Sequence, residues 1–395
     1  MKKQDHILLI INDSWGEVDW ILPVLWHLNT CWNVKITVFF KSDEIYDEKS
    51  EYKDLYKLLD LVSDEIITQQ SLSERMISDE NRLLHTIHDL LRKKLCNGID
   101  YIFHDYSGVD YSQFYNDFAQ AKVVVFPHGT FVYGWMSEKL RKDVSKTLFF
   151  DKIPKDALLL LGSENDVSFF KELTKNNNIV VSGHPKFEKR WVKTLTGVEG
   201  ERQNIQINNS EKPKILFIQY PRRRIKGKDV FENLALSVFE FAKECGAEII
   251  IKKHPRQDKN ELTRLVEKDE GSMVRFADES VLSSASKSHV AISFPSSACM
   301  DAIVAGIPVI EYFDYELEEW STFAQSGDRS TSIYRKMGLV LPANSIHELI
   351  GETNEILNNP EYRRLTIYKQ RESLEKWFKI NGHSLDTLVA ALLAL

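Results

Sequence analysis

Short apolar runs alternate with longer amphipathic segments along almost the whole chain, and this alternation most limits the folds open to it. Such a pattern is typical of parallel strands that are buried in a sheet and joined by crossover helices. The expected strands cover residues 6–12, 34–40, 100–104, 122–127, 157–161, 178–182, 214–219, 247–252, 273–276, 290–294, 307–312 and 338–341. We therefore predict an α/β protein made of parallel sheets with helices packed on their faces.

The domain organisation follows from length and from one polar stretch. A chain of 395 residues is too long for one ordinary core, which favours two domains. Polar residues from Thr196 to Pro213 resemble a linker, and the strand pattern starts again after them. We expect two doubly wound, Rossmann-like domains facing a central cleft, over residues 1–200 and 201–365, followed by a helical tail over 366–395.

Two stretches depart from the alternation. Residues 44–98 are charged and have a helical period without a strand signal, so we expect two or three helices there. The chain ends in an apolar, amphipathic segment from Leu385 to Leu395. Such a tail is expected to pack on its own protein, and docking to a membrane or a partner is the alternative.

Composition excludes several classes of function. The net charge of −7 argues against a general nucleic-acid binder, which would normally be basic. The four cysteines are far apart, with neither a CxxC pair nor zinc spacing, which fits reduced thiols in the cytoplasm. No apolar stretch reaches the ~20 residues needed to span a bilayer. We expect a cytoplasmic protein, with peripheral association at the inner face of the cell membrane left open.

Two adjacent serines stand at a strand-to-helix corner in the second half. The apolar strand over 290–294 ends at Pro295-Ser296-Ser297, a helix begins there, and the next strand ends at the lone carboxylate of Glu311. A helix N-terminus leaves backbone N–H groups unpaired and carries about half a positive charge. Together with two hydroxyls, it predicts a site for an anion such as a phosphate. The alternative is that Ser296 or Ser297 only caps the helix.

A burst of positive charge follows the expected strand over 247–252. It consists of Lys253, His254, Pro255 and Arg256. Cations beside a protonatable imidazole suit a diphosphate, or a nucleotide phosphate that leaves with extra negative charge. A solvated basic turn is the alternative. We favour the functional interpretation because the paired serines follow two strands later.

Five further positive charges lie between Arg222 and Lys228, after the first strand of the second half. They would attract an anionic donor or acceptor. They fit equally well a surface turn or a contact with anionic lipid. Arg222 is therefore a candidate donor-binding residue, although the pattern does not single it out among its neighbours.

Two histidines follow strand ends in the first half. Gly129 lets the backbone turn directly after His128 and would leave the imidazole exposed. Histidine titrates near neutral pH, so His128 could take a proton from an attacking hydroxyl; the alternative is an imidazole satisfied by a loop carbonyl. His184 precedes Pro185 at another strand-to-helix corner. It could line the cleft or stabilise a hinge, and we favour the structural role.

Two acidic residues, Asp13 and Glu17, follow the first expected strand. Ser14 and Glu17 have the spacing of a capping box, which is the favoured interpretation. The alternative is that Asp13 or Glu17 acts as a base toward an acceptor, in competition with His128.

Several common motifs are missing from the sequence. It has no Asp-X-Asp triplet, which disfavours a metal ion held on a donor diphosphate. It also has neither a GxGxxG nor a Walker A loop, which disfavours dinucleotide and P-loop chemistry. We therefore expect neither a metal ion nor a cofactor.

Taken together, the motifs resemble those of a known group of enzymes. The segments His128-Gly129-Thr130, Lys253-His254-Pro255-Arg256 and Phe294-Pro295-Ser296-Ser297, with Glu311 downstream, resemble the teichoic-acid CDP-glycerol glycerophosphotransferases. The last two segments also resemble the His-Pro and Ser-Ser motifs of bacterial capsule transferases that use CMP-activated sialic acid or Kdo. Both groups have the GT-B fold, and the resemblance covers residues from about 120 to 315.

The resemblance implies roles for these residues. His128 would be the acceptor-side catalytic residue, and His254 would contact the donor phosphate. Ser296 and Ser297 would bind phosphate at the helix start, and Glu311 would bind the nucleotide ribose.

The resulting expectation is a metal-independent transferase. It would move a group from a CMP- or CDP-linked donor onto a hydroxyl of a bacterial surface glycan, such as capsule, lipopolysaccharide or teichoic acid. The acceptor could be lipid-linked, and no nucleic-acid partner is expected. Three alternatives stay open: a UDP-sugar transferase of the same fold, an isomerase similar to UDP-N-acetylglucosamine 2-epimerase, and a relative that binds nucleotide without catalysis.

Overall fold

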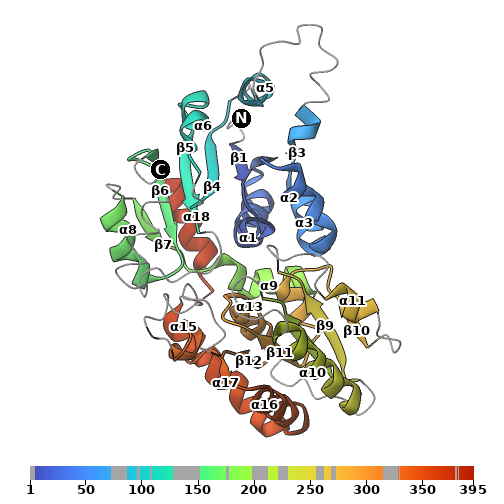
Figure 1. The fold of residues 1–395 in the computed structure, drawn as a ribbon. Helices are drawn as coiled ribbons and strands as arrows, with labels where there is room; N and C mark the ends of the chain where they lie inside the picture. The colour runs from blue at the N-terminus through green and yellow to red at the C-terminus, as the bar shows by residue number, and fades with distance from the viewer. Residues whose placement is uncertain are drawn as a thin grey trace. The chain divides into compact units, whose positions relative to one another are not determined.

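The structure is a computed structural model that describes residues 5–72, 87–95, 98–106, 109–127, 152–174, 178–197, 212–220, 230–254, 262–267, 273–314, 328, 330–378, 380 and 382–395. These residues form two compact units (Figure 1). The first unit contains the described residues up to Glu188 together with those after Phe378, and the second contains those from Lys189 to Phe378.

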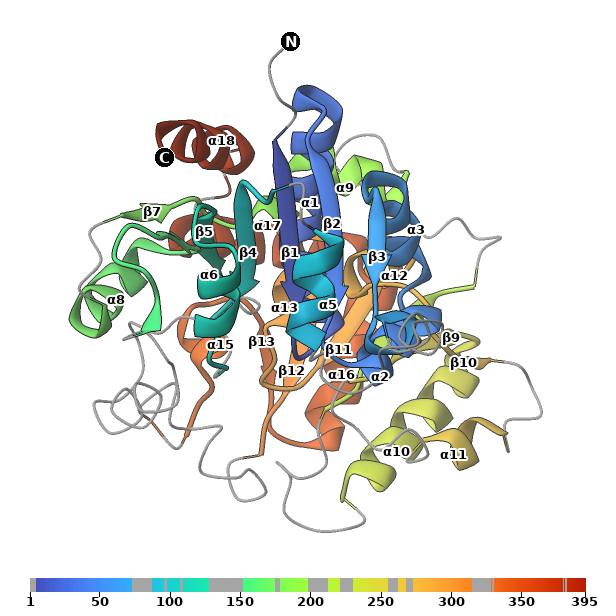
Figure 2. The same ribbon diagram turned by 90° about the horizontal axis from the view of Figure 1, so that it is seen from above.

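The first unit is built on a seven-stranded, fully parallel sheet in the order β3-β2-β1-β4-β5-β6-β7. Its strands are β1 (His6–Ile11), β2 (Lys35–Phe40), β3 (Glu65–Ile67), β4 (Tyr101–Asp105), β5 (Lys122–Phe126), β6 (Leu158–Leu161) and β7 (Ile179–Val181). Figure 2 shows β3, β2, β1 and β4 side by side. All six residues of β1 are buried, as expected for a strand inside a parallel sheet with both faces covered.

Helices cover the strands of the first unit. They are α1 (Trp15–Trp32), α2 (Asp43–Asp47), η1 (Glu48–Glu51), α3 (Lys53–Val62), α5 (Ile87–Lys94), α6 (Ser112–Asp117), η4 (Glu164–Asp166), α8 (Val167–Leu173), η5 (Pro185–Phe187) and α18 (Ser384–Ala394). Alternate strand residues point to opposite faces. Leu8, Ile10 and Ile102 accordingly share one hydrophobic cluster with Leu91 of α5 and Phe114 of α6.

The second unit is built on a six-stranded parallel sheet in the order β10-β9-β8-β11-β12-β13. Its strands are β8 (Lys214–Ile218), β9 (Glu248–Lys252), β10 (Val274–Phe276), β11 (Val290–Ser293), β12 (Val309–Tyr312) and β13 (Leu341–Ala343). Its helices are α9 (Lys189–Thr196), α10 (Val230–Cys245), α11 (Thr263–Glu267), α12 (Val281–Ala285), α13 (Ala298–Ala305), α15 (Ile333–Lys336), α16 (Ile346–Asn358) and α17 (Pro360–Trp377).

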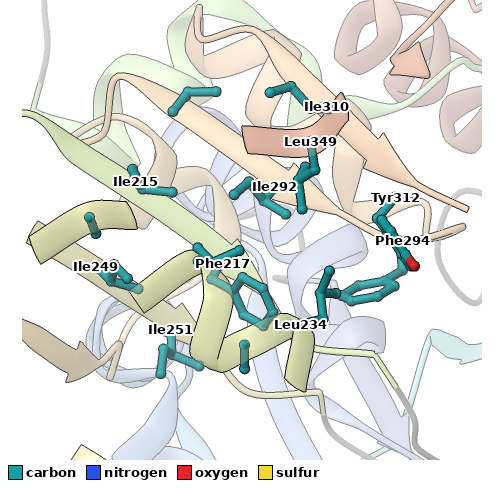
Figure 3. Packing of buried hydrophobic residues seen from close by; sticks show 14 of the residues in the cluster. Ile215, Phe217, Leu234, Ile249, Ile251, Ile292, Phe294, Ile310, Tyr312 and Leu349 are labelled. Carbon is teal, nitrogen blue, oxygen red and sulfur yellow. The ribbon is translucent and has the colours of Figure 1, made fainter. Parts of the chain in front are cut away.

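One face of the second sheet carries a hydrophobic cluster. Phe217 of β8 and Ile251 of β9 belong to it together with Leu234 of α10 and Leu349 of α16 (Figure 3). Phe294, directly after β11, extends this cluster to the carboxyl end of the strands. Burial of these side chains anchors the carboxyl ends of β8 and β11 to the core of the unit.

The α/β prediction is confirmed, because the chain forms two parallel-sheet, Rossmann-like units. The strands expected in the first half and up to residue 312 lie within two residues of the predicted positions. The last strand, β13, lies at Leu341–Ala343, slightly later than the expected 338–341.

The expectation of helices alone over residues 44–98 is wrong. Residues Glu65–Ile67 form β3, an edge strand that pairs with β2 through Thr37 and Phe39. Only Ile66 and Ile67 of this strand are apolar, and they stand in a charged stretch without a longer apolar run. Pairing with a preformed neighbour therefore decides their structure.

The C-terminal part of the chain divides between the two units. Helix α17 lies in the second unit, whereas α18 lies in the first, where it packs on α1 and β6. The Leu385 backbone N–H donates to the buried Glu188 carboxylate at 2.5 Å. The residues expected as one tail over 366–395 thus belong to two bodies, and α9 starts the second unit before residue 200.

None of the described helices combines the length and the apolar character required to cross a bilayer.

Candidate functional site

The order of the strands in the second unit reverses between β8 and β11. The chain runs outward from β8 through β9 to β10, then returns to β11 and continues through β12 to β13. Ligands of such sheets bind outside the carboxyl ends of the strands at this reversal. Tyr220 and Phe294, which follow β8 and β11, stack with ring centroids 5.2 Å apart. This contact joins the two strand ends. Arg222 lies outside the described residues.

Helix α13 begins at this corner, directly after the paired serines. Ser297 is its N-cap, and the Ser297 side chain makes no capping hydrogen bond. The Ala298 N–H points to Ser296 Oγ at 3.4 Å, which is long for a hydrogen bond of this kind. Both serines are half-buried. Their hydroxyls are therefore poorly used by the helix itself and remain suited to an anionic ligand.

The basic segment after β9 reaches the same edge of the sheet. His254 is half-buried and follows β9, which β8 separates from β11. Neighbouring strands are about 4.8 Å apart, so the axes of β9 and β11 are separated by about 10 Å. A nucleoside diphosphate is long enough to contact both strand ends. Pro255 and Arg256 lie outside the described residues.

Lys253 does not point toward the serine corner. Its ammonium lies over the ring of Phe276, 4.6 Å from the ring centroid. Phe276 belongs to β10, which flanks β9 on the side away from β8. In this arrangement the Lys253 ammonium makes a cation–π contact on the side of β9 away from β8.

The Glu311 side chain in β12 is fully buried and accepts hydrogen bonds from two other side chains. The Ser332 hydroxyl donates to Glu311 Oε1 at 2.6 Å, and Arg335 Nε donates to the same oxygen at 2.9 Å. Glu311 Oε2 is buried without a hydrogen-bond partner. The carboxylate therefore has two hydrogen-bond donors on Oε1 and none on the buried Oε2.

Burial changes the protonation of this carboxyl group. Desolvation raises the pKa of Glu311 to about 7, against the opposing attraction of Arg335 and the hydrogen bonds from Ser332 and Arg335. A buried acidic group with a raised pKa and an unsatisfied oxygen is a recurrent mark of functional sites.

Ser332 and Arg335 stand in none of the motifs found in the sequence. Both lie more than twenty residues after Glu311 and belong to no motif around it. Arg335 also donates to the backbone carbonyls of Glu311 at 2.8 Å and Ala343 at 2.9 Å. No local sequence pattern predicts such contacts, because they depend on the pairing of β12 with β13.

In the first unit, Glu17 has the contacts of a helix cap. Its carboxylate accepts the backbone N–H groups of Asn12 at 3.0 Å, Asp13 at 2.5 Å and Ser14 at 3.0 Å. The capping box with Ser14 is complete. Glu17 is thus occupied by the start of α1, whereas Asp13 is exposed at the end of β1. His128 and Gly129 lie outside the described residues.

His184 is buried inside the first unit. Its Nδ1 accepts the indole N–H of Trp20 at 3.1 Å. Burial, assisted by Lys186, lowers the pKa of His184 to about 3. The imidazole is therefore neutral at physiological pH and serves packing between η5 and α1.

The structure also brings together a cluster at the carboxyl end of β4 that sequence analysis did not select. The Tyr111 hydroxyl donates to Asp105 Oδ1 at 3.2 Å, and the His104 ring stacks on Tyr111 with centroids 4.1 Å apart. The ammonium of Lys41, which follows β2, lies 5.4 Å from the Tyr111 ring centroid. These residues border the reversal of strand order between β1 and β4.

Among the described residues, no three His, Cys, Asp or Glu side chains are grouped so that they could hold a metal ion.

Solved structures with low sequence identity share this architecture. The UDP-GlcNAc 2-epimerase of Methanocaldococcus jannaschii, solved with UDP-GlcNAc and UDP, has a TM-score of 0.59 at 14% identity, over 99% of this chain and 100% of that chain. The Neisseria meningitidis UDP-GlcNAc 2-epimerase, bound to UDP-GlcNAc, has a TM-score of 0.57 at 16% identity, over 99% and 100%. A Rickettsia africae glycosyltransferase has a TM-score of 0.51 at 12% identity, over 98% of each chain.

The chain has the GT-B fold. The expected GT-B architecture is confirmed at the level of two Rossmann-like units. These three neighbours are a pair of epimerases and a glycosyltransferase, so the resemblance to CDP-glycerol and CMP-sugar transferases is supported in fold but not in donor. No protein-family model and no curated protein matches the sequence.

Proposed function

We propose that this GT-B protein is an enzyme acting on a nucleotide-activated sugar or polyol, with the nucleotide bound by the second unit. The observation that carries the proposal is the Glu311 carboxylate, whose Oε1 is held by two donors while Oε2 is buried and unpartnered. An unsatisfied buried acceptor is costly, and a ligand hydroxyl would satisfy it. A ribose supplies such a hydroxyl beside the phosphate that Ser296 and Ser297 would bind.

The proposed reaction is transfer of the activated group to an acceptor hydroxyl of a bacterial surface glycan. The acceptor oxygen bonds to the transferred group as the bond to the nucleotide phosphate breaks, and the acceptor proton passes to a base, for which His128 is proposed. The departing phosphate gains negative charge, which His254 and the serine hydroxyls would stabilise. No step in this scheme requires a metal ion.

The donor nucleotide is proposed to be a pyrimidine. The His-Pro and Ser-Ser motifs favour a CMP- or CDP-linked donor through their family resemblance. The structural neighbours named above favour uridine, since two of them were solved with UDP-GlcNAc.

A second candidate function is epimerisation of a UDP-linked sugar. The two epimerases have higher TM-scores, 0.59 and 0.57, than the glycosyltransferase at 0.51.

Thermal shifts with CMP, CDP, UDP, GDP and ADP test nucleotide binding. We expect stabilisation by a cytidine nucleotide, and a loss of most of that shift in Glu311→Gln. Glu361→Gln is the matched control, because Glu361 is an exposed carboxylate of the same unit paired with Arg364. Preference for UDP would overturn the cytidine donor and favour the alternatives, and a lack of response to every nucleotide would overturn the proposal.

The two reactions are distinguished by their products. Incubation of the protein with UDP-GlcNAc and analysis by proton NMR would reveal inversion at C2 if the chain is an epimerase. Release of free nucleotide that depends on an added glycan acceptor would support transfer. A His128→Ala variant that retains nucleotide binding and full transfer would remove His128 from the proposed mechanism.

A further inference from the structure

Arg335 of α15 binds several groups at the carboxyl ends of β12 and β13. Its Nε donates to Glu311 Oε1, and its Nη2 donates to the carbonyls of Glu311 and Ala343. Its Nη1 donates to Asn344 Oδ1 at 2.6 Å. Four of the five N–H donors of the guanidinium are therefore used, and three of them bind groups other than the carboxylate.

Ser332 completes the same network. Its hydroxyl donates to Glu311 Oε1 and accepts the Arg335 backbone N–H at 3.1 Å, so it caps α15 and binds the carboxylate at once. The planar group of Arg335 also lies 5.1 Å from the ring centroid of Phe313. Both donors to Oε1 are thus fixed by contacts of their own.

This geometry differs from that of a purely structural ion pair. Arginine commonly binds a carboxylate with two parallel hydrogen bonds, one to each oxygen. Here Arg335 and Ser332 both bind Oε1, and Oε2 is buried with no partner. A contact that only joined β12 to α15 would gain from the second hydrogen bond, because leaving a buried acceptor unsatisfied is unfavourable.

We propose that Ser332 and Arg335 are positioning residues, which hold Oε1 of Glu311 so that Oε2 is reserved for a ribose hydroxyl and the site selects ribonucleotides over deoxyribonucleotides. The inference rests on the proposed function, because it takes the ligand to be a nucleotide. Loss of either donor lets the carboxylate rotate, so the hydrogen bond to the ribose weakens while contacts to base and phosphate are kept.

The test compares affinities of the full chain for UDP and CDP with those for their 2′-deoxy and 3′-deoxy forms, by calorimetry. A hydrogen bond to a charged group predicts that wild type prefers the ribonucleotide over one deoxy form by about tenfold or more. Ser332→Ala and Arg335→Lys are expected to reduce this preference to about threefold or less, with little change in affinity for that deoxy form.

Two variants serve as matched controls. Ser345→Ala removes another N-cap serine of the second unit, whose hydroxyl accepts the Glu348 N–H. Arg364→Lys alters an exposed arginine paired with Glu361. Both are expected to keep the wild-type preference, and circular dichroism checks that every variant is folded.

The outcomes separate this inference from the proposed function. If Ser332→Ala and Arg335→Lys reduce the affinities for the ribo and deoxy forms equally, or change only the unfolding temperature, the role of Ser332 and Arg335 is structural and the inference is wrong. If wild type binds ribo and deoxy forms equally, the inference also fails, although nucleotide binding stands. If wild type binds no nucleotide, both fail.

Discussion

Gly162 has no side chain beyond a hydrogen atom, and this leaves room for the His184 ring in the first unit. A methyl group on Gly162 would lie 2.3 Å from Cε1 of His184, whose ring is fixed by the Trp20 N–H. Such a distance is far below ordinary van der Waals contact. The close approach, more than any backbone conformation, explains the glycine at the end of β6.

We expect Gly162→Ala to lower the free energy of unfolding by about 2 kcal/mol or more, because the buried ring cannot move aside without strain. Gly351→Ala is the control, since a methyl group there would meet no atom within 4 Å. In the interior of α16 that change is expected to stabilise by about 1 kcal/mol. Thermal unfolding measures both, and a Gly162→Ala protein as stable as wild type would contradict the packing described.

Glu311 makes the stability of the second unit depend on pH. Its pKa rises from 4.5 to about 7 on folding, so between these values the folded chain keeps a proton that the unfolded chain has released. Stability contributed by this group therefore falls as pH rises from about 4.5 to about 7, and is level above that.

The measurement compares unfolding temperatures of wild type and Glu311→Gln between pH 4.5 and 8. Glutamine does not titrate, so the stability of wild type relative to the variant should decline across this interval. A difference that stays flat, or that increases with pH, would show that Arg335 and Ser332 keep the carboxyl group ionised.

At the scale of elements, the start of α1 shows how one carboxylate organises a strand-to-helix loop. Glu17 accepts three consecutive backbone N–H groups between β1 and α1. A carboxylate at this place also interacts favourably with the positive end of the helix dipole.

Glu17→Gln removes the charge and one acceptor, and we expect it to lower the free energy of unfolding by about 1–3 kcal/mol. Glu348→Gln is the comparison, because Glu348 is exposed and accepts the Asn344 N–H at the start of α16. It is expected to have the smaller effect. Equal stability of wild type and Glu17→Gln in thermal melts would argue that the carboxylate serves something other than the cap.

Element by element, the expected strands are found in the structure, and β3 is an additional one. Strands with four or more buried residues, such as β1 and β11, are found where expected. The three-residue strand β3 was missed, since its pairing with β2 rather than its own pattern specifies it. The site shows the same division: Ser296 and Glu311 stand in local motifs, whereas Ser332 and Arg335 reach Glu311 only through the fold.

At the scale of the whole molecule, the last helix belongs to the unit that the chain builds first. Helix α18 packs on α1 and β6, with Leu388 fully buried. The end of the chain therefore completes the core of the first unit after the second unit has been traversed.

Leu388→Ala is expected to lower the free energy of unfolding by about 2–5 kcal/mol, as for other leucines removed from cores. Leu393 lies on the same helix and is 63% exposed, so Leu393→Ala should change the free energy of unfolding by about 0.5 kcal/mol or less. Calorimetry of both variants checks the difference. Equal effects would mean that α18 does not pack on the first unit as described.

The sequence by itself determined the α/β class, most strand positions and the corner that carries Ser296 and Ser297, because periodicity, capping and strand-end motifs are local properties of the chain. Only the tertiary structure decided that α18 returns to the first unit, that Lys253 faces Phe276, and that Ser332 and Arg335 bind one oxygen of Glu311. These contacts join residues distant in sequence, and their energies arise only when the sheets have formed and excluded water.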